Sequence, residues 1–190
     1  EKAGLEITPA IHDYYGNEIK FYIDQGYEMI ALGSIFDPVM KRQIRTKKDI
    51  KYGIEEAIRL KPDIKIHVLA SASFDDPSRW PIYSSDAANW THNVTYGFIL
   101  WWNEDKNSYD KTDKVFFEDF HNYQDPKKTY FRQYQYQREL EEYLDQNLGL
   151  TYEDLMGFDS SLYRQVVNSF YYLVIEDKIT EEHKRRGFLY

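Results

Sequence analysis

Asp86 is the carboxylate whose surroundings are most suggestive of chemistry. The segment WPIYSSDAANW, residues 80–90, places this aspartate among Trp80, Tyr83, Trp90 and small residues. An ionised aspartate is a competent nucleophile at neutral pH, and aromatic rings are suited to line a pocket for a flat base. The same carboxylate could instead cap a helix that begins at SSDAANW. Taken alone, the segment favours the helix cap.

A histidine and a second carboxylate follow the first predicted strand. His12 and Asp13 come at the end of LEITPAIH. Imidazole and carboxylate groups perform general acid–base chemistry, but each is also common in turns at strand ends. Either residue alone is more typical of a turn. Together with Asp86 they match no spacing of metal ligands, so we expect no metal and no other cofactor.

Two further strand patterns end in small or apolar residues. YEMIALGSI reaches Gly33 and Ser34, and IKIHVLAS reaches Leu69. Gly33 either lets the chain turn or lets a flat ligand approach the backbone, because no Cβ is in the way. His67 lies inside its strand pattern and is more typical of a satisfied core histidine, so we leave it out of the candidate site.

The elements that position these residues alternate along the first part of the chain. The predicted strands cover residues 5–12, 27–35, 64–71 and 95–102, and the predicted helices cover 17–25 and 46–61. Thr46 and Asp49 form a capping-box pattern at the start of the second helix. This alternation is typical of an α/β fold with a parallel sheet. Ligands bind at the carboxyl ends of parallel strands, so the candidate residues should surround one pocket.

The connection after the second strand is rich in lysine and arginine, although the chain has a net charge of −8. A basic rim on an acidic protein suits a polyanion that docks at one edge. The residues expected to contact nucleic acid are Lys41, Arg42, Arg45, Lys47 and Lys48.

After residue 103 the sequence changes character. An acid-rich stretch leads to helices predicted at 130–146, at 162–174 and after Thr180. We therefore expect an α/β part over residues 1–102, and an acid-rich connection with a helical C-terminal portion over residues 103–190. The helical portion is a candidate partner interface.

The composition excludes several classes of protein. The chain has 0 cysteines, so disulfides, a thiolate nucleophile and cysteine-based zinc sites are excluded. No apolar run approaches the roughly 18 residues of a membrane span, and no signal peptide is recognisable. We expect a cytoplasmic protein that does not bind membranes. Because the chain starts at Glu1 and enters a strand pattern at once, we also expect it to be a piece of something longer.

Residues 9–95 resemble the second half of the tRNA-guanine transglycosylase barrel, and more closely its zinc-less phage and bacterial relatives that insert 7-deazaguanine bases into DNA. The motifs PAIHDYYG, IALGSI, IHVLAS and IYSSDAANW occur in the order of the family and at similar separations. The resemblance covers just under half of the chain. It implies a partial TIM-type (β/α) barrel, its second half, followed by the helical C-terminal portion.

The resemblance also assigns roles by position. Asp86 falls on the nucleophilic aspartate, and Gly33 with Ser34 falls on the glycine pair whose backbone contacts the base. Leu69 falls on the apolar residue that packs on the base, and His12 on the base-recognising glutamine. The other residues expected in the substrate pocket are Asp13, Tyr83 and Trp90. Ser34 and His12 depart from the family pattern, and the barrel half that supplies the general base is missing.

The implied activity is base exchange in nucleic acid, either DNA or tRNA. Asp86 would attack the anomeric carbon, expel guanine and hold a covalent glycosyl intermediate, which a free 7-deazaguanine would then resolve. Another chain or a missing N-terminal segment would complete the barrel. Two alternatives stay open: another α/β-barrel enzyme that uses Asp86 and His12 on a small sugar or phosphate substrate, and a non-catalytic binding or assembly subunit.

Overall fold

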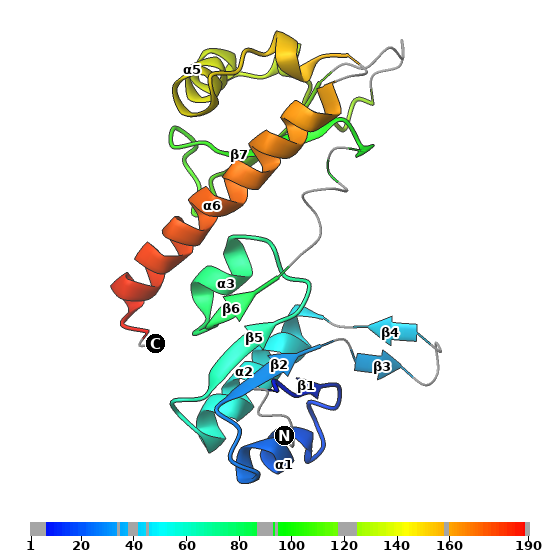
Figure 1. Ribbon diagram of the computed structural model, residues 1–190, viewed down its shortest axis with the longest axis vertical. Helices are drawn as coiled ribbons and strands as arrows, with labels where there is room; N and C mark the ends of the chain where they lie inside the picture. Colours follow the sequence, from blue (N-terminus) through cyan, green and yellow to red (C-terminus); the bar gives the residue numbers. More distant parts are fainter. Residues whose placement is uncertain are drawn as a thin grey trace. The chain divides into compact units, whose positions relative to one another are not determined.

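The chain divides into two compact units. The computed structural model describes residues 7–33, 35–37, 42–44, 46–86, 93, 95–117, 125–157 and 160–188. Unit 1 comprises Glu1–Ala87 and Ile179–Tyr190, and unit 2 comprises Ala88–Lys178 (Figure 1). The sequence suggested a boundary after residue 102. The difference arises because the strand predicted at 95–102 pairs inside unit 2.

Unit 1 is built on a four-stranded parallel sheet with the strand order β1-β2-β5-β6. The strands are β1 (Ala10–Ile11), β2 (Met29–Leu32), β5 (Lys65–Val68) and β6 (Ser84–Ser85). The register pairs Ala31 of β2 with Ala10 of β1 on one side and with His67 of β5 on the other. The α/β class and the parallel sheet predicted from the sequence are therefore confirmed. The strand β6 lies in a segment that the sequence analysis left without a strand.

Two of the three connecting helices, α1 (Glu18–Asp24) and α2 (Lys47–Leu60), pack on one face of this sheet. The third connecting helix is α3 (Asp75–Arg79). The helices α1 and α2 lie against each other and contribute Ile19 and Ile54 to the same core as Ile11, Leu32 and Val68 of the sheet. Alternation along the strands then directs Ala10, Ala31 and His67 to the opposite face.

The helix α2 begins and ends where local chemistry predicts. Thr46 and Asp49 form a complete capping box, with each side chain bonded to the other residue's backbone N–H. The helix buries Ile50, Ile54 and Ala57 along one side. It ends at Leu60, just before Pro62, whose ring cannot continue a helix.

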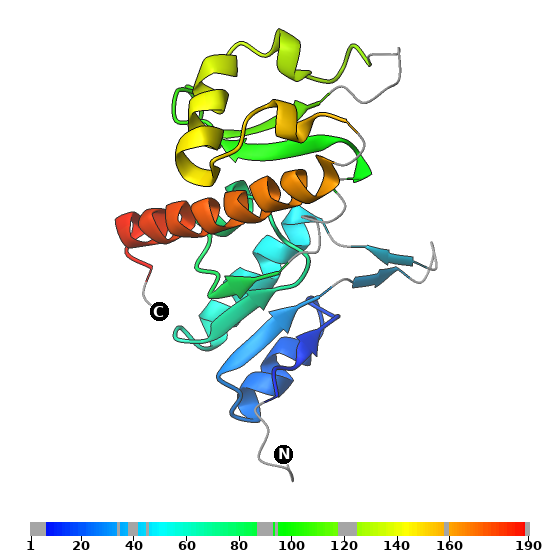
Figure 2. The same cartoon turned by 45° about the horizontal axis from the view of Figure 1, so that its top comes forward.

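Two more features belong to unit 1. The strands β3 (Ile35–Asp37) and β4 (Arg42–Ile44) form an antiparallel hairpin directly after β2. Figures 1 and 2 show this hairpin extending away from the sheet. The last turns of α6 (Ser161–Arg186) also belong to unit 1, where His183 Nε2 lies 2.6 Å from the carbonyl oxygen of Pro77.

Unit 2 combines an antiparallel strand pair with helices. The strands β7 (Phe98–Trp102) and β8 (Thr112–Phe116) pair with each other, so the expectation of a fourth parallel strand at 95–102 is wrong. The connection between them, residues 103–111, is too short for a parallel crossover, so β7 pairs with β8 as an antiparallel hairpin, and β6 is the fourth strand of the parallel sheet instead. The remaining elements are η1 (Phe131–Gln133), α5 (Gln137–Leu148), η2 (Glu153–Leu155) and the main part of α6.

A half-buried polar network around Asp113 lies beside the core of unit 2. Its carboxylate accepts hydrogen bonds from Asn103 Nδ2 at 2.9 Å and from the Tyr134 hydroxyl at 2.5 Å, and pairs with Lys106 Nζ at 2.9 Å. Burial acts to raise the pKa of Asp113. The three donors lower this pKa by more than burial raises it, so it lies below its ordinary value. Burial and the neighbouring carboxylate both raise the pKa of Tyr134.

Within the part of the chain that the structure describes, no helix combines the length and the apolar character needed to cross a membrane.

Candidate functional site

Four candidate residues form one row at the carboxyl ends of the parallel strands. The members of this carboxyl-edge row are His12, Gly33, Leu69 and Asp86. The ladder of the sheet continues into the row, because the amides of Gly33, Leu69 and Asp86 donate to the preceding strand at 3.1, 3.1 and 3.4 Å. Each member directly follows the last residue of its strand. The last residues of β1, β2 and β5 are Ile11, Leu32 and Val68, which point into the helix-covered core. The row therefore faces away from the helices.

Asp86 presents an exposed carboxylate that is held at one oxygen. Its side chain is 60% exposed, and its Oδ1 atom accepts a hydrogen bond from the Ala70 amide at 2.6 Å. Ala70 adopts a left-handed backbone conformation with φ of 53°, an uncommon geometry for a residue with a Cβ. The backbone oxygen of Asp86 also accepts from the Ser71 amide at 2.7 Å. These bonds fix Asp86 against the turn after β5.

The helix-cap interpretation of Asp86 requires the amides of residues 87–89, which lie outside the described residues. The hydrogen bond to Ala70 is therefore the structural role that can be assigned to this carboxylate. It leaves the side chain in contact with solvent.

His67 is a site residue that the sequence analysis set aside. Its Nε2 atom lies 3.8 Å from Asp86 Oδ1, and its Nδ1 atom lies 2.9 Å from the hydroxyl of Ser84. The signal was present in the strand pattern: Ile66 and Val68 alternate into the core, so His67 must share a face with Leu69. His67 is thus half-buried on the site face and not in the core.

Gly33 lets the imidazole of His12 lie against the backbone. A Cβ added to Gly33 would lie 3.0 Å from His12 Cε1 and 3.2 Å from Nδ1, closer than side chains normally pack. The hydroxyl of the buried Tyr14 donates a hydrogen bond to the carbonyl oxygen of Gly33, and the Gly33 amide donates to Ile11. Both polar backbone groups of Gly33 thus have partners within the fold. Ser34 lies outside the described residues.

Asp13 has the turn role that the sequence analysis kept as an alternative. Its Oδ1 atom accepts hydrogen bonds from the amides of Tyr15 at 3.2 Å and Gly16 at 2.9 Å. The carboxylate of Glu18 accepts from the amides of His12 at 2.7 Å and Asp13 at 2.6 Å. Asp13 and Glu18 therefore shape the turn that presents His12.

The aromatic residues near Asp86 in sequence are not gathered around it. Tyr83 lies about 10 Å back along its strand, where Lys65 Nζ sits 4.9 Å from its ring centroid. Trp80 packs against the core under the helices, with Lys51 Nζ 5.4 Å from its ring. Trp90 lies outside the described residues.

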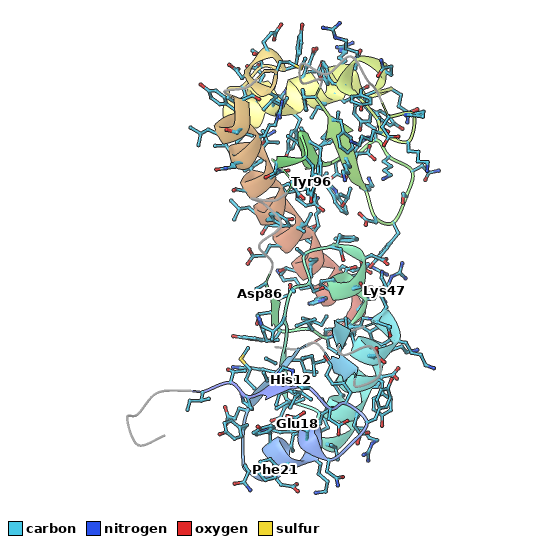
Figure 3. The ribbon with its side chains drawn as sticks, turned by 90° about the vertical axis from the view of Figure 1, so that its right-hand side faces the viewer. His12, Glu18, Phe21, Lys47, Asp86 and Tyr96 are labelled. Atoms are coloured by element: carbon cyan, nitrogen blue, oxygen red, sulfur yellow. The ribbon has the colours of Figure 1, made fainter. Side chains whose placement is uncertain are left out.

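The basic rim is only partly described. Lys47 Nζ lies 3.0 Å from Asp76 and 3.6 Å from Asp75, and the hydrogen bond to Asp76 raises the pKa of Lys47. Figure 3 shows Lys47 and Asp86 on opposite sides of unit 1. Lys48 is exposed.

The other rim residues lie in or beside the β3–β4 hairpin. Arg42 is the first residue of β4, and its backbone pairs with Asp37; its side chain is not described. Lys41 and Arg45 lie outside the described residues. The hairpin nevertheless follows β2 at the carboxyl edge of the sheet, which is the edge that carries the row.

Among the described residues, no three side chains of the His, Cys, Asp or Glu type are grouped so that they could hold a metal ion. We also compared the chain with protein-family models, curated protein sequences and solved structures, and none of them matches it.

Proposed function

We propose that the chain is a glycosyl-transferring enzyme in which Asp86 attacks the anomeric carbon of a guanine nucleotide in DNA or tRNA. The observation that carries this proposal is the Asp86 carboxylate, which is exposed at the carboxyl edge while one oxygen is held by the Ala70 amide. A carboxylate held in this way can form a covalent glycosyl intermediate. His12 and Leu69, in the same row, are the groups that would contact the base.

The exchange consists of two displacements. In the first, a C–O bond forms between Asp86 and the anomeric carbon while the glycosidic C–N bond breaks, and guanine leaves with one proton taken up. In the second, a ring nitrogen of a free 7-deazaguanine attacks the same carbon and gives up one proton, the new C–N bond forms, and the C–O bond to Asp86 breaks. The carboxylate is regenerated, so no cofactor is consumed.

The strand order in the sheet of unit 1 supports the proposal that this unit is half of a TIM-type barrel. Its parallel strands neighbour one another in chain order, and α1 and α2 pack on a single face. A doubly wound sheet instead reverses its strand order and carries helices on both faces. A second chain or a further segment would complete the barrel and supply its other strand ends.

The proposal is tested by trapping the intermediate. The full chain is incubated with guanine-containing RNA or DNA, and a hydroxylamine-sensitive covalent adduct is expected. Asp86→Asn should reduce adduct formation by at least about 10³-fold. Asp63→Asn, at an exposed turn aspartate, is the matched control and should react like the unmodified chain. An adduct that survives Asp86→Asn would contradict the assignment.

A small nucleoside or sugar phosphate is the second candidate substrate, and the ion pairs of Lys47 favour it. Asp75 and Asp76 neutralise this lysine, which weakens the rim for a polyanion. Guanosine and RNA are therefore compared at two salt concentrations. A nucleic-acid substrate should react more slowly as salt rises, because counterion release drives its binding. A reaction with guanosine that is as fast as with RNA would favour the small substrate.

A further inference from the structure

Ser84, His67 and Asp86 form a chain of contacts across two neighbouring strands. Asp86 directly follows β6 and its amide continues the ladder to Val68, so its side chain shares a face with that of Ser84. His67 lies beside both on β5, with Nδ1 2.9 Å from Ser84 Oγ and Nε2 3.8 Å from Asp86 Oδ1. The three residue types are those of a hydrolase triad, so their order and exposure decide which chemistry they suit.

The exposure of the three side chains excludes Ser84 as the nucleophile. In a serine triad the hydroxyl is open to substrate and the carboxylate is buried behind the histidine. Here Asp86 is 60% exposed, whereas Ser84 is half-buried inside the sheet and the His67 side chain is only 20% exposed. The aspartate is therefore the group that meets a substrate, and the serine is the group that orients the histidine.

The contact with Ser84 occupies Nδ1 of His67 and leaves Nε2 open towards Asp86. If Nδ1–H donates to the Ser84 hydroxyl, Nδ1 keeps its proton and Nε2 is the nitrogen that gains or loses one. Nε2 is also the nitrogen that lies next to Asp86. A group attacked by Asp86 would therefore lie within reach of this proton.

We infer that His67 is the general acid–base of the Asp86 site, with Ser84 as its positioning residue. This inference rests on the proposed function. When Asp86 attacks and the glycosidic C–N bond breaks, the electron pair of that bond stays on the departing guanine nitrogen, which takes the proton from Nε2 of the imidazolium. When the incoming base attacks, its nitrogen gives a proton to Nε2 of the neutral imidazole, and the C–O bond to Asp86 breaks. Charge and protons balance over the cycle.

A leaving group that needs no proton tests this role. A 7-methylguanine base in RNA carries a positive charge and leaves as a neutral molecule, whereas guanine must be protonated as it leaves. In the full chain, His67→Gln should slow guanine release by about 10²-fold. Release of 7-methylguanine should stay within about 3-fold of the unmodified chain, because Asp86 is still present. This second rate also reports that the variant is folded.

Ser84→Ala provides the second variant. It should slow guanine release by up to about 10-fold, since one orienting hydrogen bond is lost, and should spare 7-methylguanine release. Ser85→Ala is its matched control on the opposite face of β6 and should change neither rate. The tautomer of His67, read from the ¹⁵N shifts of its ring, should shift from Nδ1–H towards Nε2–H in Ser84→Ala.

The outcomes separate this inference from the proposed function. If His67→Gln slows both leaving groups equally, or neither, His67 is not the proton carrier, although an adduct lost in Asp86→Asn would still support the proposed function. If the unmodified chain releases neither base and forms no adduct, the proposed function fails and this inference fails with it.

Discussion

Gly33 is required by a close contact and not by an unusual backbone conformation. Its missing side chain leaves room for the His12 imidazole, which a Cβ would approach to 3.0 Å. The same residue is fixed by the Tyr14 hydroxyl and by Ile11. The position of His12 in the carboxyl-edge row therefore depends on a glycine at the end of the neighbouring strand.

Gly33→Ala should displace His12 while leaving the fold intact. We expect a loss of less than about 1 kcal/mol in the free energy of unfolding, because alanine can adopt this backbone conformation. In a double-mutant cycle, His12→Ala should remove the part of the penalty that the imidazole causes, with a coupling energy of about 0.5–1 kcal/mol, whereas the 3.3 Å approach of the new Cβ to the Ile11 carbonyl oxygen remains. Urea unfolding of the two single variants and the double variant gives this value, and additive effects would show that the contact has no energetic importance.

The sequence could predict which strand ends carry the site, but not the contacts made there. His12, Gly33, Leu69 and Asp86 were expected together because each follows a recognisable strand pattern, and the register brings them level. The turn role of Asp13 depends on local amides and was foreseen as an alternative. The role of His67 was missed, because its contacts come from Ser84 and Asp86 on another strand.

Among the elements, α2 is the one whose start is most completely encoded in local sequence. Thr46 and Asp49 form a capping box, and Asp49 also accepts a hydrogen bond from the Tyr15 hydroxyl at 2.7 Å. Burial acts to raise the pKa of Asp49, but the bonds from Thr46 and Tyr15 lower it below its usual value. The ionised carboxylate therefore links the start of α2 to the turn before α1.

Thr46→Ala should destabilise unit 1 by about 1 kcal/mol, the usual cost of losing an N-cap. Thr180→Ala, at an exposed position within α6, is the control and should change stability by less than about 0.5 kcal/mol. Thermal unfolding followed by circular dichroism measures both. Equal effects in the two variants would mean that the capping box contributes nothing specific.

The elements that the sequence missed depend on pairing at a distance. The β3–β4 hairpin and β6 are short, with 3, 3 and 2 residues, and carry too little periodicity to be recognised. The strand β7 was expected at the right place, but its partner β8 lies in an acid-rich stretch that masks a strand pattern. Two helices predicted near the end are one helix, because no breaking residue separates them.

At the scale of the whole molecule, the two units have separate cores and different buried chemistry. The core of unit 1 around the sheet packs apolar side chains such as Ile30, Leu32 and Ile66. The core of unit 2 packs around Trp101, whose indole donates to Tyr134 at 3.1 Å, and Tyr134 in turn donates to Asp113. Acid should therefore weaken unit 2 through Asp113.

The pH dependence of this effect follows from the direction of the pKa shift. The folded-state pKa of Asp113 lies below the unfolded value of about 3.9. Its stabilisation is therefore fully present above about pH 4–5 and is lost as the pH falls through the folded-state pKa. Unfolding free energies measured between pH 7 and pH 3 should fall less steeply in Asp113→Asn than in the unmodified chain.

At pH 7, Asp113→Asn should lower the free energy of unfolding of unit 2 by about 1–3 kcal/mol. Lys106 loses its charged partner, and the amide accepts fewer hydrogen bonds than the carboxylate. The indole N–H signal of Trp101 reports the unfolding of unit 2 directly. Asp63→Asn is the control with no expected effect on that signal. Parallel pH profiles for Asp113→Asn and the unmodified chain would contradict the role of Asp113.

The shortness of the outer strands of the parallel sheet has a consequence for how the sheet can pair with another chain. The strands β1 and β6 each contain 2 residues, and each is hydrogen-bonded to one neighbouring strand within the described residues. A strand of this length offers few amide and carbonyl groups to a strand from another molecule. The sheet is thereby a poor template for cross-β growth, and a chain that completes the proposed barrel would have to be held by side-chain packing as well as by strand pairing.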